Sequence, residues 1–116
     1  MSIHFTTENA QALLNDFDAH IHQAAAAGKI TTWKKSADGN YYTHVAKDWT
    51  SKAWLKPVIA TGQLIFNIIK PQNANITIPV YAYYHGHLIE TFLNHFDSKF
   101  QNGFGTALPH TGDMVK

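Results

Sequence analysis

The stretch of residues 76–96 carries the strongest structural pattern in the chain. Its first half alternates side chains between two faces, and Pro79 within it is typical of a strand at a sheet edge or with a bulge. After Gly86, apolar residues recur at the 3.6-residue spacing of a helix with one buried face. The stretch therefore predicts a strand over about residues 76–85 and a helix over about residues 86–101.

The remaining sequence predicts one more helix and three more strands. An apolar stripe near the N-terminus has helical spacing, and Gly28 is a natural end for that helix. The Asp38-Gly39 step lies between two β-prone runs and is the usual signal for a hairpin. The expected elements are a helix over about 7–27, strands over about 30–35, 41–46 and 58–69, and an irregular tail over 103–116.

The predicted order, α-β-β-β-β-α, indicates an α+β domain of two layers. We expect a single domain over residues 1–116, with a four-stranded, mainly antiparallel sheet and both terminal helices packed on one of its faces. Two helices cover only one face of such a sheet. Aromatic side chains such as Tyr81 and Tyr83 are therefore expected on an exposed second face, which is typical of an interface or a ligand groove.

Composition limits the classes of partner. The formal net charge is +1 and charged residues make up 15% of the chain, so no basic stripe is present to neutralise a nucleic-acid backbone. No stretch approaches the ~20 apolar residues of a membrane-spanning helix. The first residues lack the features of a signal peptide, and the chain has no cysteine. We therefore expect a cytoplasmic protein that binds neither nucleic acid nor membrane.

The exposed aromatic face favours a small soluble binding or interaction module that forms a homodimer through its sheet. The alternative is a small-molecule pocket protein, either a ligand carrier or a small lyase- or isomerase-like enzyme, that uses His85, Tyr83 and His44. The tryptophan-containing connector before Pro57 would then roof a groove. The candidate ligand-binding residues are Trp49, Trp54, Tyr81, Tyr83, His85 and His44.

Catalytic motifs give no support to the enzyme alternative. The chain has no nucleophile elbow, phosphate-binding loop or dinucleotide-binding fingerprint. Its carboxylates fall mostly on helix faces or in turns, and none forms an obvious acid–base pair. We therefore expect binding rather than catalysis.

The chain contains eight histidines, and imidazole is a common ligand of transition metals. His20 and His22 are two residues apart on a predicted helix, which places them roughly 200° apart around its axis. His87 and His95 are separated by about 12 Å along the second predicted helix. Neither pair is expected to hold one ion.

One compact histidine group remains near the junction of the predicted strand and helix. If strand geometry continues through Gly86, the rings of His85 and His87 project to the same face, and Glu90 lies one helical turn further on. His85, His87 and Glu90 therefore form the weaker alternative, a transition-metal site. No other cofactor is expected.

Overall fold

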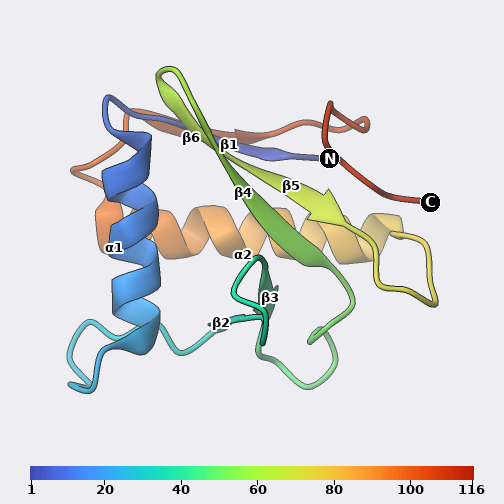
Figure 1. Cartoon of the computed structure of the whole chain (residues 1–116), viewed down its shortest axis with the longest axis horizontal. Coiled ribbons are helices and arrows are strands. Elements are labelled where there is room, and N and C mark those ends of the chain that lie inside the picture. Colours follow the sequence, from blue (N-terminus) through green and yellow to red (C-terminus); the bar gives the residue numbers. More distant parts are fainter.

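The computed structural model describes residues 1–116 and contains two helices and six strands. The strands form one antiparallel sheet in the order β2-β3-β4-β5-β1-β6. The elements are β1 (Ile3–Thr6), α1 (Ala10–His22), β2 (Trp33–Lys35), β3 (Tyr42–His44), β4 (Trp54–Ala60), β5 (Gln63–Ile69), α2 (Ile78–Phe96) and β6 (Asn102–Gly105). Figure 1 shows the sheet in front of α2, with the two ends of the chain on the same side.

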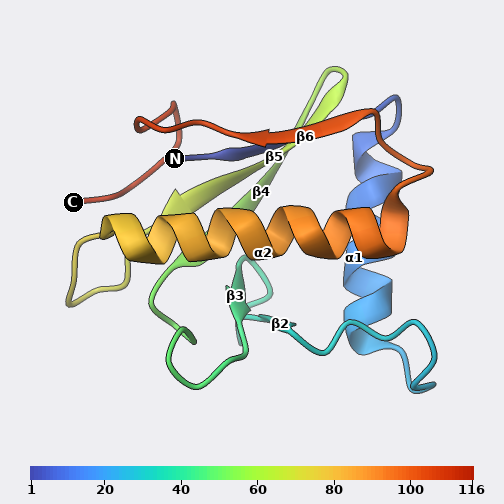
Figure 2. The ribbon, with the colours of Figure 1, turned by 180° about the vertical axis from the view of Figure 1, so that it is seen from behind.

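Both helices pack on one face of the sheet. The ring of Phe66 on β5 lies 5.9 Å from that of Phe17 on α1 and 5.8 Å from that of Phe92 on α2. Phe92 also stacks on Phe5 of β1 at 4.1 Å. Figure 2 shows α2 running across the sheet, with α1 crossing its C-terminal end. The core is therefore a layer of aromatic rings between one sheet face and two helices.

The prediction of a four-stranded sheet is wrong, because β1 and β6 extend the sheet beyond β5. Three of the four β6 residues lie in the predicted irregular tail, and Gly105 and Gly103 pair with Ile3 and Phe5 of β1. A Cβ atom on Gly103 would lie 2.9 Å from the Phe5 ring, and one on Gly105 would lie 2.5 Å from the His85 ring. The glycines allow the strand to pack closely where any side chain would clash.

The predicted strand over 76–85 is also wrong, because α2 begins at Ile78 and continues to Phe96. Pro79 lies in the first turn of this helix, where its missing N–H would have no intrahelical partner in any case. Residues four apart form the buried face: Tyr84, Leu88, Phe92 and Phe96. Burial of this stripe overrides the β-propensity of the aromatic and β-branched residues.

Two further boundaries differ from the prediction. Residues 58–69 are not one strand but parts of β4 and β5, joined by a turn at Gly62, whose φ is +76°. β4 begins at Trp54, inside the expected connector. α1 ends at His22 rather than near residue 27 because Gln23 is extended and its side-chain amide donates to carbonyls beyond the helix. The predicted hairpin is confirmed, since β2 and β3 pair around Gly39.

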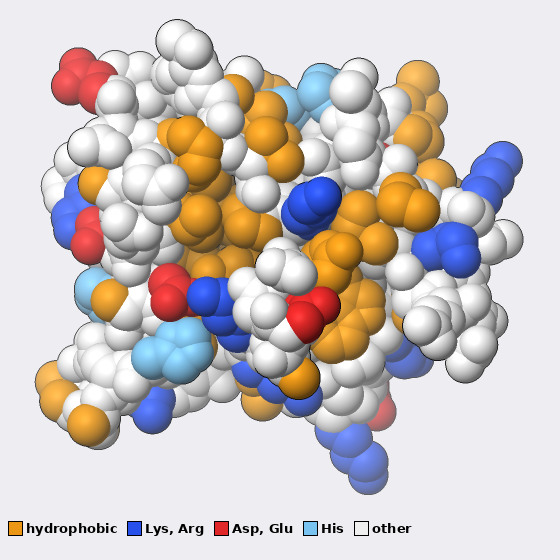
Figure 3. All heavy atoms as spheres, in the orientation of Figure 1, with side chains coloured by type: hydrophobic (Ala, Val, Ile, Leu, Met, Phe, Trp, Pro, Cys, Tyr) orange, Lys and Arg blue, Asp and Glu red, His pale blue; other side chains and the backbone are white.

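The second face of the sheet carries no helix and does not contain Tyr81 or Tyr83, which lie on α2. The irregular C-terminal residues, which we call the 106–115 segment, cover part of it through a hydrogen bond from the Asn67 amide to the Thr111 carbonyl. Hydrophobic side chains gather over the β4–β5 hairpin on this side of the molecule (Figure 3). An apolar second face therefore exists, but its residues differ from those expected.

Candidate functional site

Four aromatic side chains from three segments meet beside α2. They are His44 at the end of β3, Trp49 in the irregular residues that we call the 45–53 segment, and Tyr83 and His87 on α2. Tyr83 stacks between Trp49 and His87, with ring centroids 4.0 Å apart on both sides. The His44 ring lies edge-on at 5.0 Å from Tyr83 and 5.2 Å from His87. We call these four residues the His44 cluster.

The sequence brings these rings together by simple local rules. Tyr83 and His87 are four residues apart on one helix, so their side chains lie on the same face. His44 is the last residue of a strand whose register places it opposite Trp33. The 45–53 segment then brings the Trp49 indole onto the Tyr83 ring, with 4.0 Å between the ring centroids.

One hydrogen bond of the His44 ring determines which of its nitrogens carries the proton. Its Nδ1 accepts the backbone N–H of Ala46 at 3.0 Å, so the proton of the neutral imidazole lies on Nε2. Burial, and to a smaller extent the neighbouring His87, lowers the pKa of His44 and keeps the ring neutral at pH 7. His44 can therefore donate a hydrogen bond through Nε2–H, and this nitrogen cannot accept a proton.

This donor has no acceptor. His44 is 3% exposed, and its Nε2 atom is buried without a hydrogen-bond partner. The rings of Trp33, Tyr83 and His87 lie edge-on to His44 at 5.0–5.2 Å, and an aromatic ring is at best a weak acceptor. An unpaired buried donor costs roughly 1–3 kcal/mol, so a bound acceptor would gain most of that energy.

The 45–53 segment contains two more local irregularities. The hydroxyl oxygen of Thr50 is the other buried side-chain polar atom without a partner. Ser51 has a φ of +61° and is the only non-glycine residue with a left-handed backbone. Strained residues and unpaired polar atoms gather at ligand sites more often than elsewhere.

Hydrogen bonds from the core nevertheless hold the middle and the C-terminal end of the 45–53 segment. The Thr43 hydroxyl donates to the Ala53 carbonyl at 2.9 Å and accepts the Ser51 N–H at 3.0 Å. The Tyr84 hydroxyl donates to the Trp49 carbonyl at 2.5 Å. Burial raises the pKa of Tyr84, so this donor keeps its proton. The backbone of the segment is therefore anchored to the core, whereas the Thr50 hydroxyl and the His44 Nε2–H have no partner.

The structure separates the other residues predicted to bind a ligand. Tyr81 contacts His85 edge-on at 5.2 Å, and the His85 Nε2–H donates to the Met1 carbonyl at 2.7 Å. Burial outweighs that hydrogen bond and lowers the pKa of His85. Trp54 lies on β4, away from the cluster. Of the six predicted residues, the fold therefore brings together His44, Trp49 and Tyr83.

The structure does not bring the predicted metal ligands His85, His87 and Glu90 to one face. His85 and His87 both lie within α2, where residues two apart point in directions about 200° apart around the helix axis. Their rings therefore do not lie on one face. Glu90 is exposed on the same helix. No group of three or more His, Asp or Glu side chains is close enough to hold one ion. His44 is also unsuited to metal binding through Nε2, because its Nδ1 accepts a hydrogen bond where a ligating histidine normally donates one.

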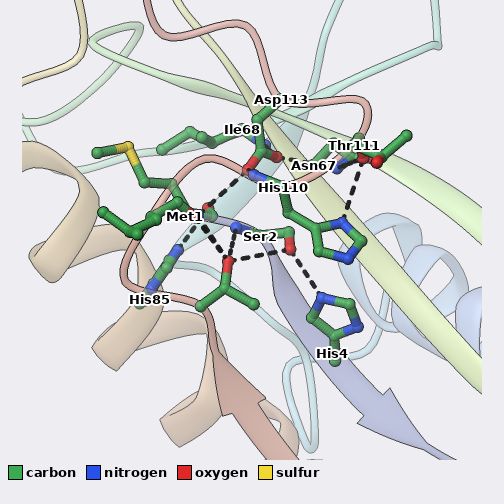
Figure 4. A network of polar contacts seen from close by, with 11 residues as sticks. Met1, Ser2, His4, Asn67, Ile68, His85, His110, Thr111 and Asp113 are labelled. Atoms are coloured by element: carbon green, nitrogen blue, oxygen red, sulfur yellow. Dashed lines mark hydrogen bonds and ion pairs between the residues drawn. The ribbon is translucent and has the colours of Figure 1, made fainter.

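A second polar network ties the 106–115 segment to the sheet (Figure 4). The buried Asp113 carboxylate accepts hydrogen bonds from the Asn67 amide and from the backbone N–H groups of Ile68 and His110, at 2.7–3.1 Å. It also lies 3.2 Å from the Met1 amine. Burial alone would raise the pKa of Asp113, but these partners together lower it.

Next to this network, Ser2, His4 and Gln63 form a chain of side-chain hydrogen bonds. The distances are 2.7 Å from the Ser2 hydroxyl to His4 Nε2 and 2.9 Å from His4 Nδ1 to the Gln63 oxygen. The order of groups matches that of a nucleophile, a base and an orienting acceptor. However, Ser2 has no exposed surface, and Phe104 stacks on His4 at 4.9 Å. We interpret this chain as structural.

Two surface clefts lie elsewhere on the molecule. One of about 460 Å³ lies between the start of α1 and residues 98–101, and its Lys99 is paired with Asp16 at 2.6 Å. The other, of about 310 Å³, is bordered by Trp54, Tyr41 and Ile69. Neither includes a residue of the His44 cluster, so in this conformation Trp49 fills the space against Tyr83.

No helix combines the length and the apolar character required to cross a membrane. Comparisons with protein-family models, with curated proteins and with solved structures find no match to this chain. The site must therefore be interpreted from its own geometry.

Proposed function

We propose that the protein is a small-molecule-binding domain whose binding site is the His44 cluster. The observation that carries the proposal is the buried Nε2–H of His44, which lacks an acceptor. The unpaired Thr50 hydroxyl and the left-handed Ser51 in the adjoining segment support the same location. A bound molecule that accepts the His44 hydrogen bond would satisfy the group that the free protein leaves unpaired.

The surroundings of His44 define the chemical class of the ligand. Tyr83 offers a flat ring face, which the Trp49 indole covers in a parallel stack with an angle of 9° between the planes. A planar conjugated ligand would take the place of the indole on Tyr83. It would carry a carbonyl, carboxylate or ring nitrogen directed at His44, because a donor N–H disfavours a cationic group at that position.

Paired probes and variants test this proposal. Indole and indole-3-carboxylate share one ring, but only the second carries a carboxylate acceptor. Trp49→Ala frees the face of Tyr83, so we expect both probes to bind this variant more tightly than the wild type in calorimetry or NMR titration. Trp54→Ala is the matched control, because Trp54 lies outside the cluster, and it should change neither affinity.

The hydrogen bond is tested by His44→Phe in the Trp49→Ala background. Hydrogen bonds to charged groups contribute roughly 1.5–3 kcal/mol, so affinity for indole-3-carboxylate should fall about tenfold or more. Affinity for indole should stay unchanged. An equal loss for both probes, or no binding of either probe to Trp49→Ala at millimolar concentration, contradicts the proposed site.

We also propose self-association through the second face of the sheet as a second candidate function. Val58, Ile65, His4 and Phe104 are successive cross-strand neighbours on that face, and Val58 and Phe104 at its ends are 37% and 46% exposed. The net charge of +1 gives little repulsion between two copies.

Light scattering at high micromolar concentration tests the dimer. Val58→Asp should give a monomer, because it places a charge in the apolar row. Leu93→Asp is the matched control, since Leu93 is 53% exposed but lies on α2. A strict monomer for the wild type contradicts this second candidate.

We further propose a cytoplasmic location. The support is the absence of cysteine, which fits a reducing compartment where disulfides do not form. Fractionation of cells that produce a tagged chain tests it, and recovery outside the cytoplasmic fraction contradicts it.

A further inference from the structure

α1 crosses α2 near the C-terminal end of α2 (Figures 1 and 2). The imidazole rings of His20 on α1 and His95 on α2 contact each other. Each histidine lies in the last turn of its helix. Their ring centroids are 6.0 Å apart, with an angle of 72° between the ring planes. Both rings also contact Phe96, which limits their movement.

Hydrogen bonding leaves His20 ready to act as a metal ligand. Its Nδ1–H donates to the Asp16 carbonyl at 2.8 Å, so the neutral ring carries its free lone pair on Nε2. A backbone carbonyl as the partner of the other ring nitrogen is the usual arrangement around a ligating histidine. Burial, and then the neighbouring His20, lowers the pKa of His95, which favours the neutral ring that a metal ligand requires.

The electrostatic surroundings favour a cation. His20 and His95 each lie in the last turn of a helix, where unpaired carbonyl groups give the helix end partial negative charge. Close to the pair, Asp16, whose carbonyl accepts the His20 hydrogen bond, also forms an ion pair with Lys99 at 2.6 Å. This ion pair partly offsets the positive charge of Lys99, which lies 6.0 Å from the centre of the Phe96 ring.

We propose that His20 and His95 together bind one divalent transition-metal ion, of the class of Zn²⁺, Cu²⁺ or Ni²⁺, between α1 and α2. Imidazole nitrogen suits these ions, and a separation of 6.0 Å between the ring centroids leaves room for one ion at a metal–nitrogen distance of about 2.1 Å from each ring. Water completes the coordination, so the site has two protein ligands and stays open to solvent. The ion joins two helices that otherwise meet through side-chain packing.

Thermal unfolding with added ZnCl₂ at pH 7.5 tests the site. At a concentration tenfold above the dissociation constant, linkage predicts a rise in Tm of about 4–8 °C. His95→Gln and His20→Gln should abolish the rise. His22→Gln is the matched control, because His22 makes the same bond to a helix carbonyl, at 2.8 Å from Asp18, and should keep the rise in full.

A second measurement locates the ion without any variant. Substoichiometric Cu²⁺ should broaden the ¹H–¹⁵N NMR signals of residues near His20 and His95 in the wild-type protein, and EDTA should restore them. Broadening centred on His85 or His87 instead, an unchanged Tm in ZnCl₂, or a rise that survives in His95→Gln would each overturn the proposal.

Discussion

The 45–53 and 106–115 segments are both irregular and both cover parts of the fold. They differ in whether their buried polar groups have hydrogen-bond partners. In the 106–115 segment, Asp113 is paired with the Asn67 side chain, two backbone N–H groups and the Met1 amine. In the 45–53 segment and the adjoining His44, two buried polar atoms have no partner. Native proteins pair nearly all such groups, so the difference separates a structural segment from a candidate site.

The largest effect is expected in the 106–115 segment. Asp113→Ala leaves three hydrogen-bond donors and the Met1 amine without their shared acceptor, so we expect the free energy of unfolding to fall by about 3–5 kcal/mol. Asp113→Asn keeps one acceptor oxygen and should cost less. Urea denaturation followed by circular dichroism measures both. A loss below about 1 kcal/mol for Asp113→Ala would show that this segment does not stabilise the fold.

Two threonines give a matched test within the region of the His44 cluster. Thr43→Val removes a hydroxyl that is paired with Ala53 and Ser51, and we expect it to destabilise the protein by about 2–3 kcal/mol. Thr50→Val replaces an unpaired hydroxyl with a methyl group and should stabilise it by about 1 kcal/mol. Denaturant midpoints measure both changes. Equal losses for the two variants would mean that Thr50 has a partner in solution.

Acid should destabilise the folded protein. Burial is the main cause of the lowered pKa values of His44, His85 and His95. Between the folded and unfolded pKa values the unfolded chain binds protons that the folded chain does not, so stability is lost as pH falls from 7 to 5. Tm measured across this range checks the direction. His44→Gln and His85→Gln should each make the slope shallower, and a Tm that rises toward pH 5 would contradict the assignment.

The smallest expected effect concerns backbone strain in the 45–53 segment. Ser51 has a φ of +61°, a conformation that glycine adopts without steric cost. We expect Ser51→Gly to stabilise the protein by about 0.5 kcal/mol, because relief of strain exceeds the added entropy of the unfolded chain. Lys52→Gly is the control and should destabilise it. Thermal unfolding resolves the two, and a loss for Ser51→Gly would mean that the backbone there is unstrained.

Local signals in the sequence predicted local structure well. The hairpin at Gly39 follows from a turn that needs a positive φ, and the structure has +80° there. The apolar stripe of α1 identified the helix, although Gln23 ends it earlier than Gly28 would. Such features depend on residues within one or two turns, so the chain alone specifies them.

The stretch 76–85 shows where local signals fail. Its β-branched and aromatic residues favour a strand, and the same residues place Tyr84 in line with Leu88, Phe92 and Phe96 on a helix. The residues form a helix because this stripe is buried in the core, where Phe92 packs against Phe5 and Phe66. The strand β6 was not predicted because its glycines give no alternating apolar pattern. They are required only by close packing against Phe5 and His85.

The sequence by itself determined an α+β domain, a hairpin, an N-terminal helix and a supply of histidine and aromatic rings. It also identified His44, Trp49 and Tyr83 as candidate ligand-binding residues. Only the tertiary structure decided that His87 rather than His85 joins them, and that His20 meets His95. The physical reason is that a helix turns its side chains by about 100° per residue, so helix position and packing select the neighbours.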